Sequence, residues 1–146
     1  MHWGMIRICN CMLVIAGLWI ISAPAASVAA SLSGTYQIVH QSEAAGQARI
    51  QIQIHLVNHG PGELHIRRIT LWDFSHPAKA GTQASSLLLP SAGSADTTQE
   101  FTVPRAEYEL WKRGARPRLV LEIETPHGHP ATEVVHLDRV SGGKGD

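Results

Sequence analysis

Histidine is the residue type that gives this chain most of its potential chemistry. Nine histidines occur in 146 residues, and eight of them follow residue 30. Imidazole is the commonest metal ligand in proteins and the side chain that changes charge between pH 5 and 8. The enrichment suggests a metal site, although histidine is also tolerated as an ordinary residue of strands and loops. The eight are His40, His55, His59, His65, His76, His127, His129 and His136.

Three of these histidines and one aspartate are the candidate metal ligands. They lie in polar turns rich in glycine or proline, and three imidazoles with one carboxylate suffice to bind zinc or copper(II). Because they are far apart in the sequence, a shared site requires a fold that gathers three turns at one end. The candidates are His59, Asp96, His127 and His129, from the turns 58–62, 91–97 and 126–130.

Other charged residues indicate less specific chemistry. Glu122 and Glu124 share one face of a predicted strand and could form a carboxylate pair, but their apolar neighbours in the sequence place that face toward water. The adjacent Arg67 and Arg68 could contact an anion, or simply extend into solvent. The chain has no Gly-x-Ser-x-Gly elbow, no His-Glu-x-x-His and no phosphate-binding glycine loop before a helix. We therefore predict that the protein is not an enzyme.

The first thirty residues have the order of a secretory signal peptide. Arg7 precedes the apolar run 12–21, which is followed by Pro24 and by small residues up to Ala30. The run is shorter than the roughly 20 apolar residues that cross a bilayer, so an uncleaved anchor is the less favoured alternative. We predict cleavage just before Ser31 and a secreted or periplasmic product.

Removal of residues 1–30 would leave a chain without sulfur, because both cysteines and all three methionines lie within them. Such a chain has no disulfide, thiolate nucleophile or zinc–thiolate site. Its 11 lysines and arginines against 12 aspartates and glutamates give a formal charge of −1. No global field then favours nucleic acid, and nothing indicates stable membrane insertion after cleavage.

The stretch Ala48–Trp72 organises the elements that would position these residues. Four apolar residues at positions 50, 52, 54 and 56 alternate with polar ones, which is the period of a half-buried strand. The run stops at Asn58–Gly62, where glycine and proline predict a turn. In the next run, Leu64–Trp72, the apolar phase reverses at Arg67–Arg68, and one extra residue in a β-bulge accounts for the reversal.

The motif Asn58-x-Gly60-x-x-x-Leu64-x-Ile66 stands between these two strands. It resembles the signature of small bacterial immunoglobulin-like domains of the ASPM-SPD-2-Hydin and fibronectin type III kind. The resemblance implies an architecture and not a function.

The rest of the chain predicts five further short strands, at 35–40, 86–90, 99–103, 118–124 and 132–140. Residues 31–34 are expected to be a flexible lead, and 41–47 and 91–97 to be turns. A short crossover helix is expected from Pro104 to Gly114, with Tyr108 and Trp111 against the sheets. The fold class is therefore all-β, an antiparallel immunoglobulin-like β-sandwich of about seven strands at residues 31–140, followed by a disordered tail at 141–146.

In the immunoglobulin order the second and third strands lie in opposite sheets, so the turn after Asn58 should cross between sheets instead of closing a hairpin. The turns after the second, fourth and sixth strands should gather at one end. Two functions fit this picture. We favour a non-catalytic module that binds another protein or an envelope component through a sheet face or its loops. The alternative is a small histidine-based metal-binding protein that holds zinc or copper(II).

Overall fold

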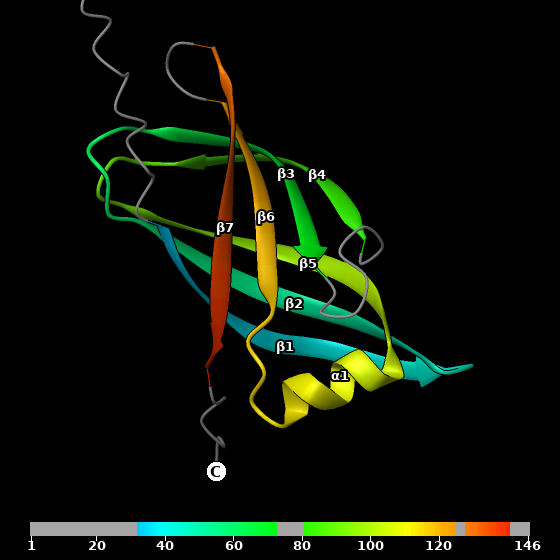
Figure 1. Ribbon diagram of the computed structural model, residues 1–146. Helices are drawn as coiled ribbons and strands as arrows, with labels where there is room; N and C mark the ends of the chain where they lie inside the picture. The colour runs from blue at the N-terminus through cyan, green and yellow to red at the C-terminus, as the bar shows by residue number, and fades with distance from the viewer. Residues whose placement is uncertain (1–31, 73–80, 125–127, 141–146) are drawn as a thin grey trace, which may run out of the picture.

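The computed structural model describes residues 32–72, 81–124 and 128–140, which form seven strands and one short helix (Figure 1). The predicted signal peptide at 1–30 and the predicted tail at 141–146 lie outside the described residues, as do 73–80 and 125–127. In chain order the elements are β1 (Leu32–Ala44), β2 (Gln47–Asn58), β3 (Leu64–Trp72), β4 (Thr82–Leu89), β5 (Ser94–Pro104), α1 (Arg105–Lys112), β6 (Arg118–Glu124) and β7 (Pro130–Arg139).

The strands form one curved sheet in the order β4-β3-β6-β7-β1-β2-β5. Neighbours are antiparallel except β1 and β7, which run in the same direction from Gly34 opposite Leu137 to Tyr36 opposite Arg139. The two outer strands approach one another, since the Gln83 carboxamide on β4 donates to the Glu100 carbonyl on β5 at 3.1 Å. The sheet is therefore almost closed into a barrel (Figure 1).

The all-β prediction is confirmed, with seven strands and one short helix in the described residues. The sheet is mixed, however, whereas the sequence predicted antiparallel pairing throughout. The parallel contact is short, because only the first residues of β1 lie beside the last residues of β7.

β2 and β3 do not pair with each other. β2 is hydrogen-bonded to β1 on one side and β5 on the other, and β3 lies between β4 and β6. The turn after Asn58 therefore does not close a hairpin, as the sequence predicted, but it joins two strands of one sheet and not strands of two opposite sheets. The predicted bulge is confirmed, because the register of β3 against β6 shifts between Ile66 and Arg68.

The alternating apolar residues of β2 form the centre of the core, where all four are fully buried. They pack inside the curved sheet with the apolar faces of β3 and β6. Burial of such side chains stabilises the fold by roughly 1.5–3 kcal/mol each. The residues are Ile50, Ile52, Ile54 and Leu56.

The helix α1 closes one end of the core, as the sequence predicted. It begins directly after Pro104, and Gly114 stands beyond its end with a positive φ of 97°. Tyr108 and Trp111 are both buried, and each is confirmed as a core residue. The Trp111 indole meets the ring of Tyr36 edge-on at 6.0 Å between centroids, which ties the helix to β1.

Strands β1 and β5 are longer than the sequence predicted. The predicted turn at 41–47 is wrong, because β1 continues to Ala44 and only Ala45 and Gly46 form the turn, with φ of 50° and 75°. The predicted lead is also strand from Leu32 onward, and β5 starts at Ser94. These segments have no apolar alternation that would mark them as strands in the sequence. Backbone pairing with β2 keeps them extended.

Within residues 32–72, 81–124 and 128–140, the helix is too short and too polar to span a lipid bilayer.

Candidate functional site

The outer side of β1, β2 and β5 carries a regular array of polar side chains. Because side chains alternate along a strand, the residues between the buried isoleucines of β2 face away from the core. The strand register brings them into two rows of three. We call these six residues the polar face: Thr35, His55 and Asp96 in one row, and Gln37, Gln53 and Thr98 in the next.

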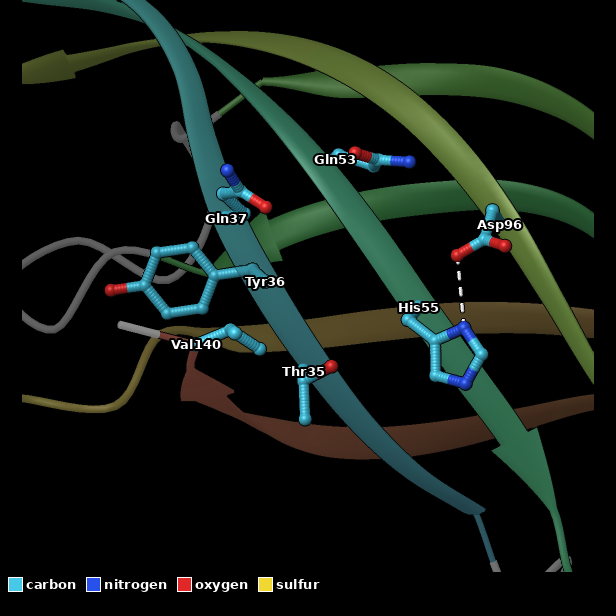
Figure 2. Close-up of a pocket in the computed structure, with 7 residues that line it drawn as sticks. All are labelled: Thr35, Tyr36, Gln37, Gln53, His55, Asp96 and Val140. Atoms are coloured by element: carbon cyan, nitrogen blue, oxygen red, sulfur yellow. Dashed lines mark hydrogen bonds and ion pairs between the residues drawn. The ribbon is translucent and has the colours of Figure 1, made fainter. Parts of the chain in front are cut away.

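A depression of about 280 Å³ lies on this face (Figure 2). It is open to solvent, and most of its lining belongs to the polar face. None of its lining residues is lysine or arginine, and the single carboxylate is that of Asp96. The lining consists of Thr35, Tyr36, Gln37, Gln53, His55, Asp96 and Val140.

A hydrogen bond joins His55 and Asp96 within the depression, at 2.9 Å between Nδ1 and Oδ1 (Figure 2). Both side chains are well exposed, at 43% and 60%, so the pair adds little to stability. The contact favours the tautomer that carries its proton on Nδ1, which leaves Nε2 as an acceptor in the neutral imidazole. The aspartate therefore sets the orientation of the imidazole on the open face.

Gln37 and Gln53 stand directly opposite each other on β1 and β2. Figure 2 shows both carboxamides on the same side of the sheet as the His55 imidazole. A carboxamide carries two donors and an acceptor, and a threonine hydroxyl both donates and accepts. The depression can thus satisfy ligand groups that donate and accept hydrogen bonds at the same position.

The four predicted metal ligands lie in different settings. The His59 Nε2 contacts the Ser33 hydroxyl at 2.8 Å, and Asp96 lies within β5 against His55, not in a turn. His129 is exposed just before β7, and His127 lies outside the described residues. No group of three or more His, Cys, Asp or Glu able to hold a metal occurs in the described part of the chain. A site that includes His127 stays a prediction.

The turns after β2 and β4 do come together, and Asn58 joins them. Its carboxamide, in a residue only 1% exposed, donates to the carbonyls of Gly62 at 2.6 Å and Pro90 at 3.0 Å, and it accepts from the Gly60 amide at 2.9 Å. The Ala92 amide also donates to the Gly60 carbonyl. The end of β6 pairs with the start of β3, so the third turn leaves from the same end of the sheet. The asparagine and glycine of the sequence motif therefore have a structural role.

The charged residues of β3 and β6 pair with each other on the opposite outer face. Arg68 contacts both carboxylate oxygens of Glu122, at 2.9 and 3.0 Å, and Arg67 pairs with Glu124. The prediction that these side chains face water is confirmed. Their mutual pairing argues against a glutamate pair poised for acid–base work, since each carboxylate already lies against a guanidinium.

The sequence singled out only Asp96 of the polar face as a site residue. Alternation along β2 did indicate that His55 and the glutamines point outward. What the sequence could not provide was the register that places Gln37 beside Gln53, and Asp96 beside His55. That register is set by pairing along the full length of β1 and β5.

The chain matches no known protein-family model and no curated protein sequence. Among solved structures it is similar to a Northeast Structural Genomics Consortium target, with a TM-score of 0.47, 8% identity, and coverage of 80% of this chain and 89% of that chain. It is also similar to a protein from Archaeoglobus fulgidus, with a TM-score of 0.40, 11% identity, and coverage of 73% and 90%. Neither protein is described by an activity.

Proposed function

We propose that the protein is a non-catalytic, secreted or periplasmic β-sandwich module of the immunoglobulin-like kind, which binds another protein or a cell-envelope component. The polar face is its recognition surface. The observation that carries this proposal is the open depression that six exposed or partly exposed side chains and Tyr36 line on the outer side of β1, β2 and β5.

The strand order supports the immunoglobulin-like assignment. In that fold the first, second and fifth strands share one sheet, and the third, sixth and seventh share the other. Here β1, β2 and β5 are consecutive neighbours, as are β3, β6 and β7. β4 lies beside β3, the side on which immunoglobulin variable domains carry additional strands. The short parallel contact of β1 with β7 joins the two groups.

The openness of the site favours binding over catalysis. Electrostatic stabilisation of a transition state is strongest where water is excluded and dipoles are fixed. The His55–Asp96 pair is exposed on an outer sheet face, so water reaches and screens it. Exposed polar side chains on a rigid sheet suit recognition instead, because little conformational freedom is lost when a ligand binds.

The N-terminal thirty residues support export, and the intact mass of the exported protein tests it. A mass equal to that of a chain beginning at Ser31 agrees with the proposal. Retention of residues 1–30 in a membrane fraction contradicts it.

Binding itself is tested with the exported protein and the isolated cell envelope of its own cells. We expect saturable retention of the native protein and a loss of at least about fivefold for the double variant His55→Ala, Asp96→Ala, because the ligand loses two of the three groups of one row. The matched control is Arg68→Ala, Glu122→Ala, which removes an equally exposed cross-strand pair on the other outer face. Equal retention of all three proteins would contradict a role for the polar face.

A further inference from the structure

The lining of the depression restricts the charge of its ligand. Anions such as phosphate or carboxylate are bound by guanidinium, ammonium or several converging amide groups. The seven lining residues include neither lysine nor arginine. An anionic ligand would therefore meet no fixed positive charge and would lie beside the carboxylate of Asp96.

A cationic ligand is also poorly matched. Asp96 provides the single carboxylate, and it already accepts a hydrogen bond from His55. One exposed, partnered carboxylate binds a cation weakly in water. The charge of the lining thus points to a ligand without net charge.

An apolar ligand would find little surface to cover. Tyr36 lines the depression but is only 1% exposed, so its ring is already used by the core against Trp111. Val140, 46% exposed, is the one apolar side chain in the lining that presents substantial area. The remaining lining is hydroxyl, carboxamide, imidazole and carboxylate, which lose solvation when a lipid covers them.

A neutral ligand rich in hydroxyl groups matches the polar groups of the lining. Thr35, Gln37 and Gln53 each present both a donor and an acceptor, and each hydroxyl of a sugar does the same. The neutral imidazole of His55, whose Nδ1–H faces Asp96, adds an acceptor at Nε2. Adjacent strands lie about 4.8 Å apart, and successive outward residues about 6.8 Å apart along a strand. These spacings place hydrogen-bonding groups at the scale that separates hydroxyls across neighbouring sugar rings.

An extended peptide is the other neutral polar ligand, and the topology disfavours it. Peptides that bind sheets gain much of their affinity by pairing with an unpaired strand edge. β2, which carries Gln53 and His55, has β1 and β5 bonded on its two sides. The depression therefore offers side chains and no free main-chain ladder at its centre.

We infer that the depression binds a short stretch of a neutral polysaccharide, with Gln37 and Gln53 as its central contacts. This inference rests on the proposed function, which it narrows to one class of envelope component. Because the lining exposes no aromatic ring for a sugar to stack on, hydrogen bonds carry the interaction, and the dissociation constant for an oligosaccharide should be on the order of 1 mM.

The test is a nuclear magnetic resonance titration of the protein in the form that its own cells produce. The probes are two neutral hexasaccharides, one of glucose and one of N-acetylglucosamine. We expect at least one to give saturable shifts in the side-chain amide signals of Gln37 and Gln53 and in the backbone amide signals of Thr35, His55 and Asp96. The backbone signals also report binding by variants that lack the two glutamines. The double variant Gln37→Ala, Gln53→Ala should bind about tenfold more weakly. Gln41→Ala, an exposed glutamine of β1 outside the depression, should bind within about twofold of the native protein.

A second variant, Thr35→Val, tests the same depression without changing either glutamine. Thr35→Val preserves the shape of the side chain and removes only its hydroxyl, so we expect a loss of about two- to fivefold. The inference is overturned if neither hexasaccharide shows binding at a concentration of about ten times the expected dissociation constant. Equal binding by Gln37→Ala, Gln53→Ala also overturns it, as does stronger binding of a glycine–serine hexapeptide or of polyphosphate at the same signals.

The two proposals fail in different ways. Envelope retention that depends on His55 and Asp96, without binding of either hexasaccharide, keeps the recognition surface and overturns the saccharide as its ligand. If envelope retention does not depend on His55 and Asp96 and neither hexasaccharide binds, both proposals are overturned.

Discussion

The carboxamide of Asn58 donates a hydrogen bond to the carbonyl oxygen of Pro90 at 3.0 Å, and so joins the turn after β2 to the turn after β4. The same side chain bonds Gly60 and Gly62, which fixes the crossing from β2 to β3. The asparagine is 1% exposed, so water cannot replace these three hydrogen bonds. The sequence motif at this turn thus records how two connections are held together.

Asn58→Ala should therefore destabilise the fold by about 3 kcal/mol, because three backbone groups each lose a partly buried hydrogen bond. The control is Ser91→Ala, which removes one exposed bond to the Pro61 carbonyl and should cost about 1 kcal/mol or less. Urea unfolding of both variants measures the difference. An Asn58→Ala midpoint equal to that of Ser91→Ala would show that the turns are held by their backbone bonds alone.

Much of the fold could be predicted because β2 carries its pattern without interruption. The alternation from Ile50 to Leu56 predicted the central strand, and the phase reversal at Arg67–Arg68 predicted the bulge. Pro104 and Gly114 predicted the two ends of the helix. The polar face could not be predicted in the same way. Its glutamines and Asp96 meet through pairing between strands distant in the sequence, and the outer parts of β1 and β5 have no apolar alternation to mark them as strands.

The hydroxyl of Tyr36 is buried and has no hydrogen-bond partner among the residues that the structure describes. Tyr36→Phe removes that unsatisfied group and keeps the ring contact with Trp111, so its free energy of unfolding at pH 7 should be unchanged or higher by up to about 1 kcal/mol. Thermal or urea unfolding checks this. A loss of more than about 1 kcal/mol would mean that the hydroxyl has a partner in solution, such as a bound water.

The same residue gives the fold an alkaline limit. Burial raises the pKa of the Tyr36 phenol above its ordinary value of 10.0, against a smaller opposing effect of Arg139. Below pH 10 the phenol is protonated in both folded and unfolded chains, so it adds no pH dependence. Above pH 10 the unfolded chain ionises first, and stability falls as pH rises. The native protein should therefore lose stability more steeply than Tyr36→Phe between pH 10 and 11.5, and parallel curves would contradict this.

The predicted metal site is tested by zinc titration of the native protein and of His127→Ala, His129→Ala. We expect equal and weak binding in both, because Asp96 is engaged with His55 and His59 contacts Ser33. Isothermal titration calorimetry at pH 7.5 measures both affinities. Submicromolar zinc binding by the native protein that the double variant loses would favour the metal-binding alternative over the binding module.

The most direct test of the polar face places one bulky charge at its centre. Gln53→Arg puts a guanidinium among the lining side chains and leaves the backbone pairing of β2 intact, while Thr132→Arg adds the same charge to an exposed position of β7 on the other outer face. Saturable retention on the isolated cell envelope should fall at least about tenfold for Gln53→Arg and stay within about twofold for Thr132→Arg. Retention that is the same for Gln53→Arg and the native protein would contradict the account.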